Sequence, residues 1–437
     1  MASNPAAQYL LKFKDHFFWS NIISSDGTHI NSRICLLMHH EKHGFFIGTK
    51  NFTRKVEQFR KTPIVTISVM PPNDHTSVVA QAYVEVRQDK EIIKDLWTDD
   101  MKKYGYSGID DERITYCLLH ILHLKHGNQE FEGEQMDYTI IDKMNHSEPL
   151  PALRAGPFQE EEGAKLIKEQ FGTEQNCHLV SFKDGYYHND RMVVVRYSDE
   201  FGLHCTTSPN AAKYREILAN PNVSVLLEQR ETMGQVVIDA VATPCDCLET
   251  KKKLFHDRLP TRGIKTPESP EYGLILFKPR AIYIHAISNS SPKELHFPPT
   301  KYDKDVALIA QASATHRLCY LATVSEKNEV HMRMMGATFC HPTLGPYVVS
   351  KYTQRKNKEL VANPSFAIGL YDHITTDEYV IEGHAYQVHN KMIGHTIWSD
   401  AMKAVGYTGP DDESITIIRL VPTKTECINC KKAFGLS

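Results

Sequence analysis

Apolar and polar residues alternate in short runs along most of the chain, which is the pattern of half-buried β-strands. The runs "HFFWSNII", "CHLVSF" and "CYLATV" each precede a polar segment: "SSDGT", "KDGYY" and "SEKNE" respectively. Gly, Asp and Asn in these segments are typical of tight turns. Further strand-like runs follow each hairpin, together with segments that have helical spacing. The pattern therefore predicts antiparallel sheets with helices attached.

The chain repeats itself at a fixed offset. "LWTDDMKKYGYSGIDDERIT", which begins at Leu96, and "IWSDAMKAVGYTGPDDESIT", which begins at Ile397, are identical at twelve of the nineteen positions that follow their first residue. The same offset of 301 residues aligns "GTKNFTRKVEQF" from Gly48 with "VSKYTQRKNKEL" from Val349. One offset that holds across two separate motifs indicates duplicated domains.

A third and less similar copy lies between these two. "CTTSPNAAKYREILANPNVSV", from Cys205, aligns with "VVSKYTQRKNKELVANPSFAI", from Val348, and both copies contain Ala-Asn-Pro. Proline-containing polar stretches separate the copies, "HSEPLPALRAGP" and "NSSPKELHFPPTKYDKD", and they resemble linkers. We therefore expect three tandem domains, over residues 1–148, 149–300 and 301–437. The expected fold is mainly β with α (α+β): small antiparallel barrels, each with two or more flanking helices.

Composition narrows the class of protein. The chain has 437 residues, of which 41% are hydrophobic and 24% charged, and its formal net charge is -3. This balance argues against a general nucleic-acid or membrane-surface protein, which would carry a basic excess. The N-terminus lacks the pattern of a secretory signal, and no apolar run approaches the roughly 18 residues of a membrane span. Ten scattered cysteines suit reduced thiols. We expect a cytoplasmic protein.

Each copy carries a small cationic motif: one arginine on its second strand, a hydroxyl residue at the end of its third, and a basic residue or pair at the start of a short helix. Arginine makes two parallel hydrogen bonds to a phosphate, lysine adds a point charge, and the first turn of a helix adds free N–H groups. A phosphate monoester is the ligand that this chemistry suits. We call the sets the first, second and third cradles: Arg33, Thr49, Arg54 and Lys55; Arg191, Thr207 and Lys213; Arg333, Ser350, Arg355 and Lys356.

These motifs resemble the FMN-binding split barrels, the superfamily that includes pyridoxamine 5'-phosphate oxidase and the general stress flavoproteins. The resemblance rests on the strand arginine of "VHMRMM", the hydroxyl residue six positions before Lys, "ANP", and the late "W…M…GY…G…DDE" segment. It implies three tandem split barrels and FMN as the cofactor. The first and third cradles would hold the FMN phosphate, and neighbouring strand residues would offer backbone groups near the ring: Ile47, Gly48, Val348 and Val349.

The second cradle is incomplete because Ala212 stands where the other copies have arginine. The loss of one charge-assisted contact costs about 1.5–3 kcal/mol, so we expect this site to bind weakly or not at all. In the resembled family the flavin lies between two barrels. Three barrels in one chain therefore imply that two pair internally and that the remaining one pairs with its copy in a homodimer.

The function implied is a flavoprotein, an FMN-dependent oxidoreductase that takes electrons from NAD(P)H or another small donor. No catalytic acid or base stands out. The family's oxidase has a lysine five residues after the strand arginine, where this chain has Met38 and Thr338, so we do not expect pyridoxamine phosphate as substrate. Two alternatives remain open: a non-catalytic FMN-binding or scaffold protein, and a haem-binding split barrel.

Other motifs are interpreted as structural, and no metal site is expected. The histidines of "HHEKH" and "HILHLKH" fall in a turn and on a strand, and "CINC" and "CDC" lack the second pair of ligands that a zinc site needs. Trp97 and Trp398 are expected to pack their helix against the barrel. The acidic run at Asp110–Asp111–Glu112 is expected to form a turn before the last strand.

Overall fold

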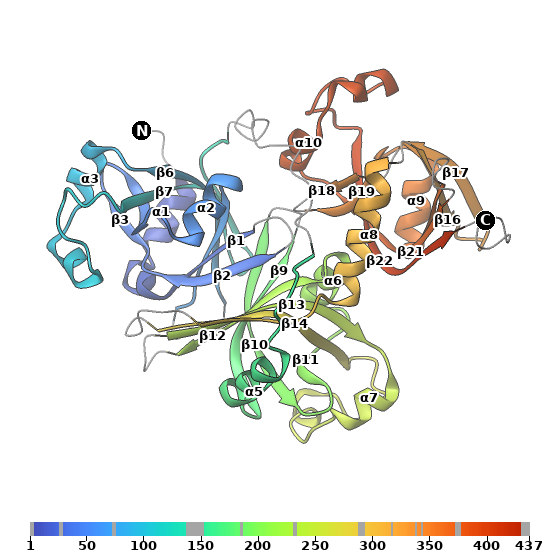
Figure 1. Ribbon diagram of the computed structural model, residues 1–437, viewed down its shortest axis with the longest axis horizontal. Helices are drawn as coiled ribbons and strands as arrows, with labels where there is room; N and C mark the ends of the chain where they lie inside the picture. The colour runs from blue at the N-terminus through green and yellow to red at the C-terminus, as the bar shows by residue number, and fades with distance from the viewer. Residues whose placement is uncertain are drawn as a thin grey trace.

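The computed structural model describes residues 4–25, 29–71, 76–136, 153–183, 187–229, 234–286, 293–315, 318–336, 339–341, 344–371 and 377–429. Over these residues the strands form three antiparallel sheets, and each sheet uses one stretch of the chain. We call the parts that build them the first, second and third modules (Figure 1). The mainly antiparallel β architecture with tandem split barrels is confirmed. The expected boundary at 148/149 lies outside the described residues.

The first module has the strand order β2-β1-β5-β6-β7-β4-β3, with β8 paired to β7. Its elements are α1 (Pro5–Leu11), η1 (Lys14–Trp19), β1 (Ser20–Ser25), β2 (Ile30–Cys35), β3 (Met38–His40), β4 (Gly44–Lys50), α2 (Arg54–Lys61), β5 (Ile64–Val69), β6 (Val78–Arg87), α3 (Lys90–Leu96), η2 (Asp99–Tyr104), β7 (Ile114–His126) and β8 (Gln129–Glu132).

The second module has the order β11-β10-β9-β12-β13-β14-β15, and β11 also pairs with β14, which closes the sheet into a barrel. Its elements are α5 (Glu160–Phe171), β9 (Glu174–Phe182), β10 (His188–Ser198), β11 (Gly202–Thr207), α6 (Ala212–Ala219), β12 (Asn222–Gln229), β13 (Gly234–Cys245), α7 (Leu248–Lys253), η4 (Pro260–Arg262), β14 (Gly273–Ala286) and β15 (Lys293–His296).

The third module repeats the order of the first, β17-β16-β20-β21-β22-β19-β18. Its elements are α8 (Lys301–Thr315), β16 (Leu318–Val324), β17 (Val330–Gly336), β18 (Phe339–His341), β19 (Gly345–Lys351), α9 (Arg355–Ala362), β20 (Ser365–Tyr371), β21 (Asp377–Val388), α10 (Lys391–Ile397), η5 (Asp400–Val405) and β22 (Ile415–Asn429).

Strand register relates the three modules residue by residue. In each module the strand arginine lies opposite an apolar residue of the preceding strand, and the pairs are Ile22–Arg33, Leu179–Arg191 and Leu321–Arg333. In each, the long strand hairpin after the short helix carries one β-bulge, at Gln81/Ala82, Asp239/Ala240 and Glu382/Gly383. Positions in one module can therefore be matched to positions in another.

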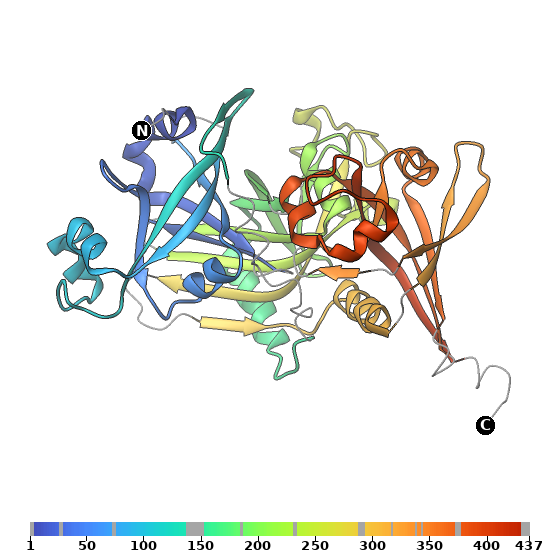
Figure 2. The same ribbon diagram turned by 90° about the horizontal axis from the view of Figure 1, so that it is seen from above.

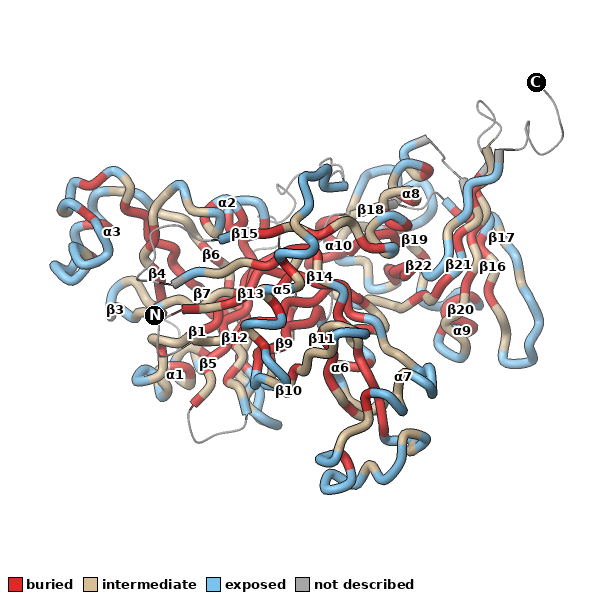
Figure 3. The backbone as a smooth tube through the Cα atoms, turned by 60° about the horizontal axis from the view of Figure 1, so that its bottom comes forward, coloured by how far each residue is buried: buried red, intermediate tan, exposed pale blue. Residues whose placement is uncertain are grey.

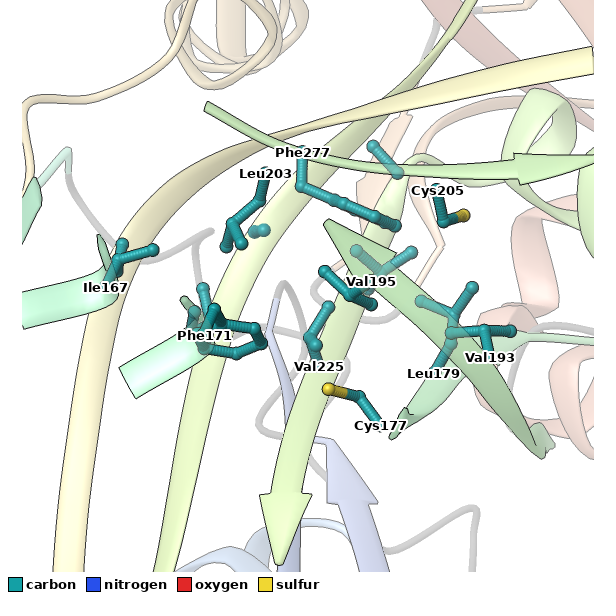
Figure 4. Close-up of a cluster of buried hydrophobic side chains, with 14 of the residues drawn as sticks. Ile167, Phe171, Cys177, Leu179, Val193, Val195, Leu203, Cys205, Val225 and Phe277 are labelled. Carbon is teal, nitrogen blue, oxygen red and sulfur yellow. The ribbon is translucent and has the colours of Figure 1, made fainter. Parts of the chain in front are cut away.

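Each module has its own buried apolar core. In the second module, Phe171 of the leading helix lies in one buried cluster with strand residues such as Leu203 and Val225 (Figure 4). Burial of such side chains contributes about 1.5–3 kcal/mol each, so each core stabilises its own barrel. Red buried segments in Figure 3 accordingly run through the strands of all three modules.

The first and second modules pack against each other through matched strands. Ile23 and Ile30 form one buried cluster with Val180 and Phe182. Polar pairs surround this cluster: the Asn21 side-chain amide donates to Asp190 at 3.2 Å, and the Ser32 and Ser224 hydroxyls are 2.7 Å apart. The Thr66 hydroxyl and His188 Nδ1 are 3.3 Å apart.

Two expectations about local structure were wrong, and one kind of helix was missed. The first half of "HFFWSNII" is the 3-10 helix η1, not strand. The expected helix through Trp97 ends at Leu96, with Trp97 as its C-cap, and Trp398 caps α10 in the same way. A further helix precedes each barrel and was not predicted: α1, α5 and α8. Among the described residues no helix has the length and apolar character that crossing a membrane requires.

Candidate functional site

In the first cradle, strand β2 carries Arg33 and helix α2 begins with Arg54, and the two elements pack against each other. The Arg33 guanidinium donates to the Ser24 hydroxyl at 3.0 Å and to the Gln58 side-chain oxygen at 2.5 Å, and it lies 5.8 Å from the centre of the Phe59 ring. Gln58 is buried, with 3% of its surface exposed. The strand arginine is thus held against the helix that begins at Arg54.

Arg54 connects the first cradle to the second module. Its guanidinium donates to the Asn31 side-chain oxygen at 2.7 Å and lies 4.6 Å from the centre of the Tyr283 ring, which belongs to β14. Burial, and secondarily the charge of Lys55, lowers the pKa of His285 on the same strand. Two residues of the second module therefore border the first cradle.

Three further residues predicted in the first module, Ile47, Gly48 and Thr49, lie on β4, and Lys55 lies in the first turn of α2. Thr49 is buried, and its hydroxyl is 3.1 Å from that of Thr53, the residue before α2. Ile47 points into the module core, while a side chain at Gly48 would contact Tyr116 and Met38. Ile47 can therefore reach a ligand only through its backbone.

The third cradle has the same arrangement, but its strand arginine contacts a glutamate where that of the first cradle contacts Gln58. Arg333 donates to the Thr323 hydroxyl at 2.7 Å and to the Glu359 carboxylate at 2.8 Å. Arg355 lies 3.1 Å from the same carboxylate, which also accepts from His331 at 2.7 Å. Burial opposes the charge of Glu359, but hydrogen bonds from Thr323 and His331 and the charge of Arg333 hold its pKa below the usual range.

Lys356 and Ser350 share partners at the start of α9. The Ser350 hydroxyl donates to the Gln354 side-chain oxygen at 2.9 Å and accepts from the Asn357 amide at 3.0 Å. The Lys356 ammonium also donates to Gln354. Burial, together with the charge of Arg333, lowers the pKa of Lys356 to about 8. A lysine placed so close to other cations favours an anionic ligand.

The strand residues predicted beside the third cradle are Val348 and Val349. Val348 is fully buried in the core of the third module. Val349 is half-buried and packs against an apolar cluster that includes residues of α10. Because the Val348 side chain is buried in this core, as the Ile47 side chain is in the first module, Val348 can reach a ligand only through its backbone.

The second cradle is organised around an internal ion pair. Arg191 donates to the Ser181 hydroxyl at 2.7 Å and to the Glu216 carboxylate at 2.6 Å. The Thr207 hydroxyl donates to the neighbouring Ser208 carbonyl at 3.5 Å, and burial lowers the pKa of Lys213. Helix α6 begins at Ala212, so its first turn brings no arginine.

Sequence reasoning missed several residues of these cradles. Thr53 and Gln354, and likewise Gln58 and Glu359, are related by the same 301-residue offset and could have been found from it. Tyr283 could not, because its contact with Arg54 depends on how two modules pack.

The other motifs have structural contacts. Asp111 accepts hydrogen bonds from the backbone N–H of Ser107 and of Arg113, and Asp412 accepts those of Thr408 and Ser414. The Arg113 guanidinium and the Ser107 N–H hold the pKa of Asp111 well below its usual range. The repeated acidic run thus includes the residue that closes each turn.

The histidine motifs form separate pairs. In "HHEKH", His43 lies 2.8 Å from Asp95. In "HILHLKH", His120 lies 3.1 Å from Glu134 and His126 lies 3.1 Å from the Tyr9 hydroxyl. Within the described part of the chain, no three His, Cys, Asp or Glu side chains cluster as metal ligands would. Thr338 and Cys430 lie outside the described residues.

The first and third cradles have the donors that a phosphate monoester needs. Each combines a strand arginine, an Arg-Lys pair at a helix start and a buried hydroxyl residue. Three cations near one point suit the roughly -1.5 to -2 charge of such a group. The residues present therefore fit the phosphate end of FMN.

Comparison with known proteins gives one family match. Residues 304–433 match the family described as "Pyridoxamine 5'-phosphate oxidase like". No curated protein matches the chain.

Solved structures that resemble parts of the chain include three of interest. General Stress Protein 26 from Bacillus anthracis is 23% identical, covering 31% of this chain and 99% of its own, with a TM-score of 0.27. A putative pyridoxamine 5'-phosphate oxidase from Listeria innocua is 24% identical, covering 28% of this chain and 98% of its own, with a TM-score of 0.25. HutZ, a haem storage protein from Vibrio cholerae, is 12% identical, covering 28% and 92%, with a TM-score of 0.23.

The matched residues coincide with the third module, whose strand order the first module repeats. The third module is thus similar to the pyridoxamine 5'-phosphate oxidase like family over residues 304–433.

Proposed function

We propose that the chain is an FMN-binding flavoprotein in which the first and third cradles hold the cofactor phosphate. The observation that carries this proposal is the duplicated arrangement: Arg33 with Arg54–Lys55, and Arg333 with Arg355–Lys356, each bring a strand arginine against the helix that begins with the Arg-Lys pair. Backbone groups of Ile47, Gly48, Val348 and Val349 would lie beside the flavin ring. The second cradle, with Arg191 paired to Glu216, would bind weakly or not at all.

The chemistry proposed is that of an FMN-dependent oxidoreductase that accepts electrons from NAD(P)H or another small donor. The flavin supplies the redox chemistry, and the protein supplies its binding and position. Met38 lies on β3 and its side chain faces Gly48, so an apolar group stands where the family's oxidase has a lysine. This supports a substrate other than pyridoxamine phosphate. A cytoplasmic location and a homodimer belong to the same proposal.

The visible spectrum and an FMN titration of the full chain test this proposal. Flavin bands near about 375 and 450 nm, with micromolar or tighter binding, are the expected result, and bleaching of these bands by NAD(P)H would support the oxidoreductase. Bound flavin that NAD(P)H does not reduce would favour the non-catalytic alternative. A Soret band would favour haem, and a protein that binds neither would overturn the proposal.

A further inference from the structure

Arg419, on β22 of the third module, is a buried arginine with two nitrogens that have no partner. The residue has 2% of its surface exposed. Its Nε and Nη2 are both buried and find no hydrogen-bond partner, and no carboxylate of the described residues forms an ion pair with the guanidinium. A buried charge without a partner destabilises a fold. An arginine in this state therefore indicates a binding site for an anion.

The other two modules have leucine at the position of this arginine. Strand register matches Arg419 to Leu118 in the first module and to Leu276 in the second. Leu118 is buried in an apolar cluster of its own module. The barrel therefore forms without a charge at this position, and packing alone does not explain why the third module has one.

One of the two nitrogens lies beside Gly345, together with a tyrosine hydroxyl. Helix α8 packs against β22 and β19 (Figures 1 and 2), and Tyr302 in its first turn hydrogen-bonds with the Arg419 guanidinium. A Cβ added at Gly345 would lie 3.7 Å from the Tyr302 hydroxyl and 3.8 Å from Nη2 of Arg419. Because glycine has no side chain, there is room for one more atom beside both groups.

The two nitrogens also define the shape of the ligand. Nε and Nη2 lie on one edge of the guanidinium, and their N–H groups point in parallel. This edge makes two hydrogen bonds to the two oxygens of a carboxylate or of a phosphate. The ligand is therefore an anion that presents two oxygens side by side.

The surroundings of Arg419 favour a carboxylate over a phosphate. Its cross-strand neighbours are Tyr347 and Tyr386, and Tyr347 belongs to a buried apolar cluster with Ile417. In apolar surroundings one guanidinium balances one negative charge, whereas a phosphate monoester carries about -1.5 to -2. The three cations of the third cradle suit that larger charge, and its Ser350 lies three residues along β19 from Tyr347, about 10 Å away.

We infer that Arg419 binds the carboxylate of a small organic acid, with Nε and Nη2 each donating to one oxygen and the Tyr302 hydroxyl beside them. This site is separate from the three cradles and does not depend on FMN. Burial lowers the pKa of Arg419, and a bound carboxylate favours the charged guanidinium again. The acid therefore stabilises the folded chain when it binds.

The test is thermal melting of the purified full chain in sodium acetate, against sodium chloride at the same ionic strength. The melting temperature of the wild type should rise with acetate and reach a plateau, as binding at one site requires. Arg419→Leu should lose this rise. In chloride it should melt no lower than wild type, because leucine occupies the matched positions and the variant removes an unpaired buried charge.

Tyr302→Phe removes the neighbouring hydroxyl and keeps the test decisive if Arg419→Leu melts lower than expected. The loss of one hydrogen bond should raise the acetate concentration that gives half of the effect about three- to tenfold.

Lys358→Leu is the matched control, since it removes one positive charge from an exposed position of α9 in the same module. Its half-effect concentration should stay within about threefold of wild type. Three results would each overturn the inference: a wild type that acetate stabilises no more than chloride does, an acetate effect unchanged in Arg419→Leu or in Tyr302→Phe, and a larger effect of sodium phosphate that depends on Arg419. An acetate effect through Arg419 in a chain that binds no FMN would uphold the inference while refuting the proposed function.

Discussion

The first and third cradles share their cationic residues but differ in the helix residue that contacts the strand arginine. Gln58 contacts the strand arginine in the first, and Glu359 contacts it in the third. The carboxylate of Glu359 accepts from Arg333 and approaches Arg355, so an incoming phosphate meets a negative charge there. The side-chain amide of Gln58 presents no such charge. We therefore expect the two cradles to differ in anion affinity, with the first cradle binding the proposed FMN phosphate more tightly.

The largest expected effect comes from removing the Arg-Lys pair. Arg54→Ala/Lys55→Ala should weaken FMN binding by the first cradle at least about 100-fold, because each charge-assisted contact contributes about 1.5–3 kcal/mol. Arg355→Ala/Lys356→Ala should do the same at the third cradle alone. Calorimetric titration of each variant with FMN measures the affinity of the cradle that remains intact.

Arg60→Ala/Lys61→Ala is the control for these double variants, since it removes the same charge from the exposed end of α2. The FMN affinity of both cradles should stay within about threefold of wild type, because salt screens a surface charge at this distance. Equal loss of both sites in either double variant would mean that the cradles are wrongly assigned.

A reciprocal exchange of Gln58 and Glu359 tests whether this residue decides which cradle binds FMN more tightly. Gln58→Glu should weaken FMN binding by the first cradle about tenfold, and Glu359→Gln should strengthen binding by the third about tenfold, because a charge beside a phosphate readily contributes 1.4 kcal/mol. Each exchange is measured with the other cradle disabled by its double variant. Glu57→Gln, which removes an exposed charge from α2, should change little. Shifts in the same direction for both exchanges would refute the electrostatic explanation.

The pH dependence of FMN binding should differ between the first and third cradles because of Lys356. Burial and the charge of Arg333 lower the pKa of this lysine to about 8, so without ligand it loses its proton above that pH. A bound dianion favours the protonated form, and binding above pH 8 must therefore take up a proton. FMN affinity of the third cradle should be nearly constant between about pH 7 and 7.5, where the phosphate is mostly a dianion, and fall about five- to tenfold by pH 9.

Lys356→Gln provides the check on this pH effect. The variant should bind FMN more weakly at pH 7.5 but lose no further affinity by pH 9, as followed by quenching of flavin fluorescence. A wild-type third cradle with the same affinity at both pH values would show that Lys356 does not contact the phosphate.

The smallest expected effect tests the contribution of the second module to the first cradle. Tyr283→Leu removes the ring that lies against Arg54 and should weaken FMN binding there about threefold, because a cation–π contact at such a site contributes about 0.5–1 kcal/mol. The third cradle should be unaffected. Tyr197→Leu, a half-buried tyrosine packed against the core of the same module, is the control for general destabilisation.

The sequence alone predicted the repeats and the sheets, because these depend on local periodicity and a constant offset. The cradle residues follow from the same offset, and their role in binding a cofactor stays a prediction. The sequence alone did not predict the leading helices. α1, for example, has seven residues and is held by contacts such as that of the Asn4 amide with the Ile121 carbonyl. It also missed the roles of Gln58, Glu359 and Tyr283, since a contact with an arginine on another element is visible only once strands and modules are packed.

The most direct test of the central claim is an FMN titration of the full wild-type chain, followed by the same titration of Arg54→Ala/Lys55→Ala. The account predicts one FMN for each complete cradle, with the tighter site lost in the variant and the weaker one retained. A chain that binds no FMN at micromolar concentration, or whose tighter site survives the loss of Arg54 and Lys55, would contradict it.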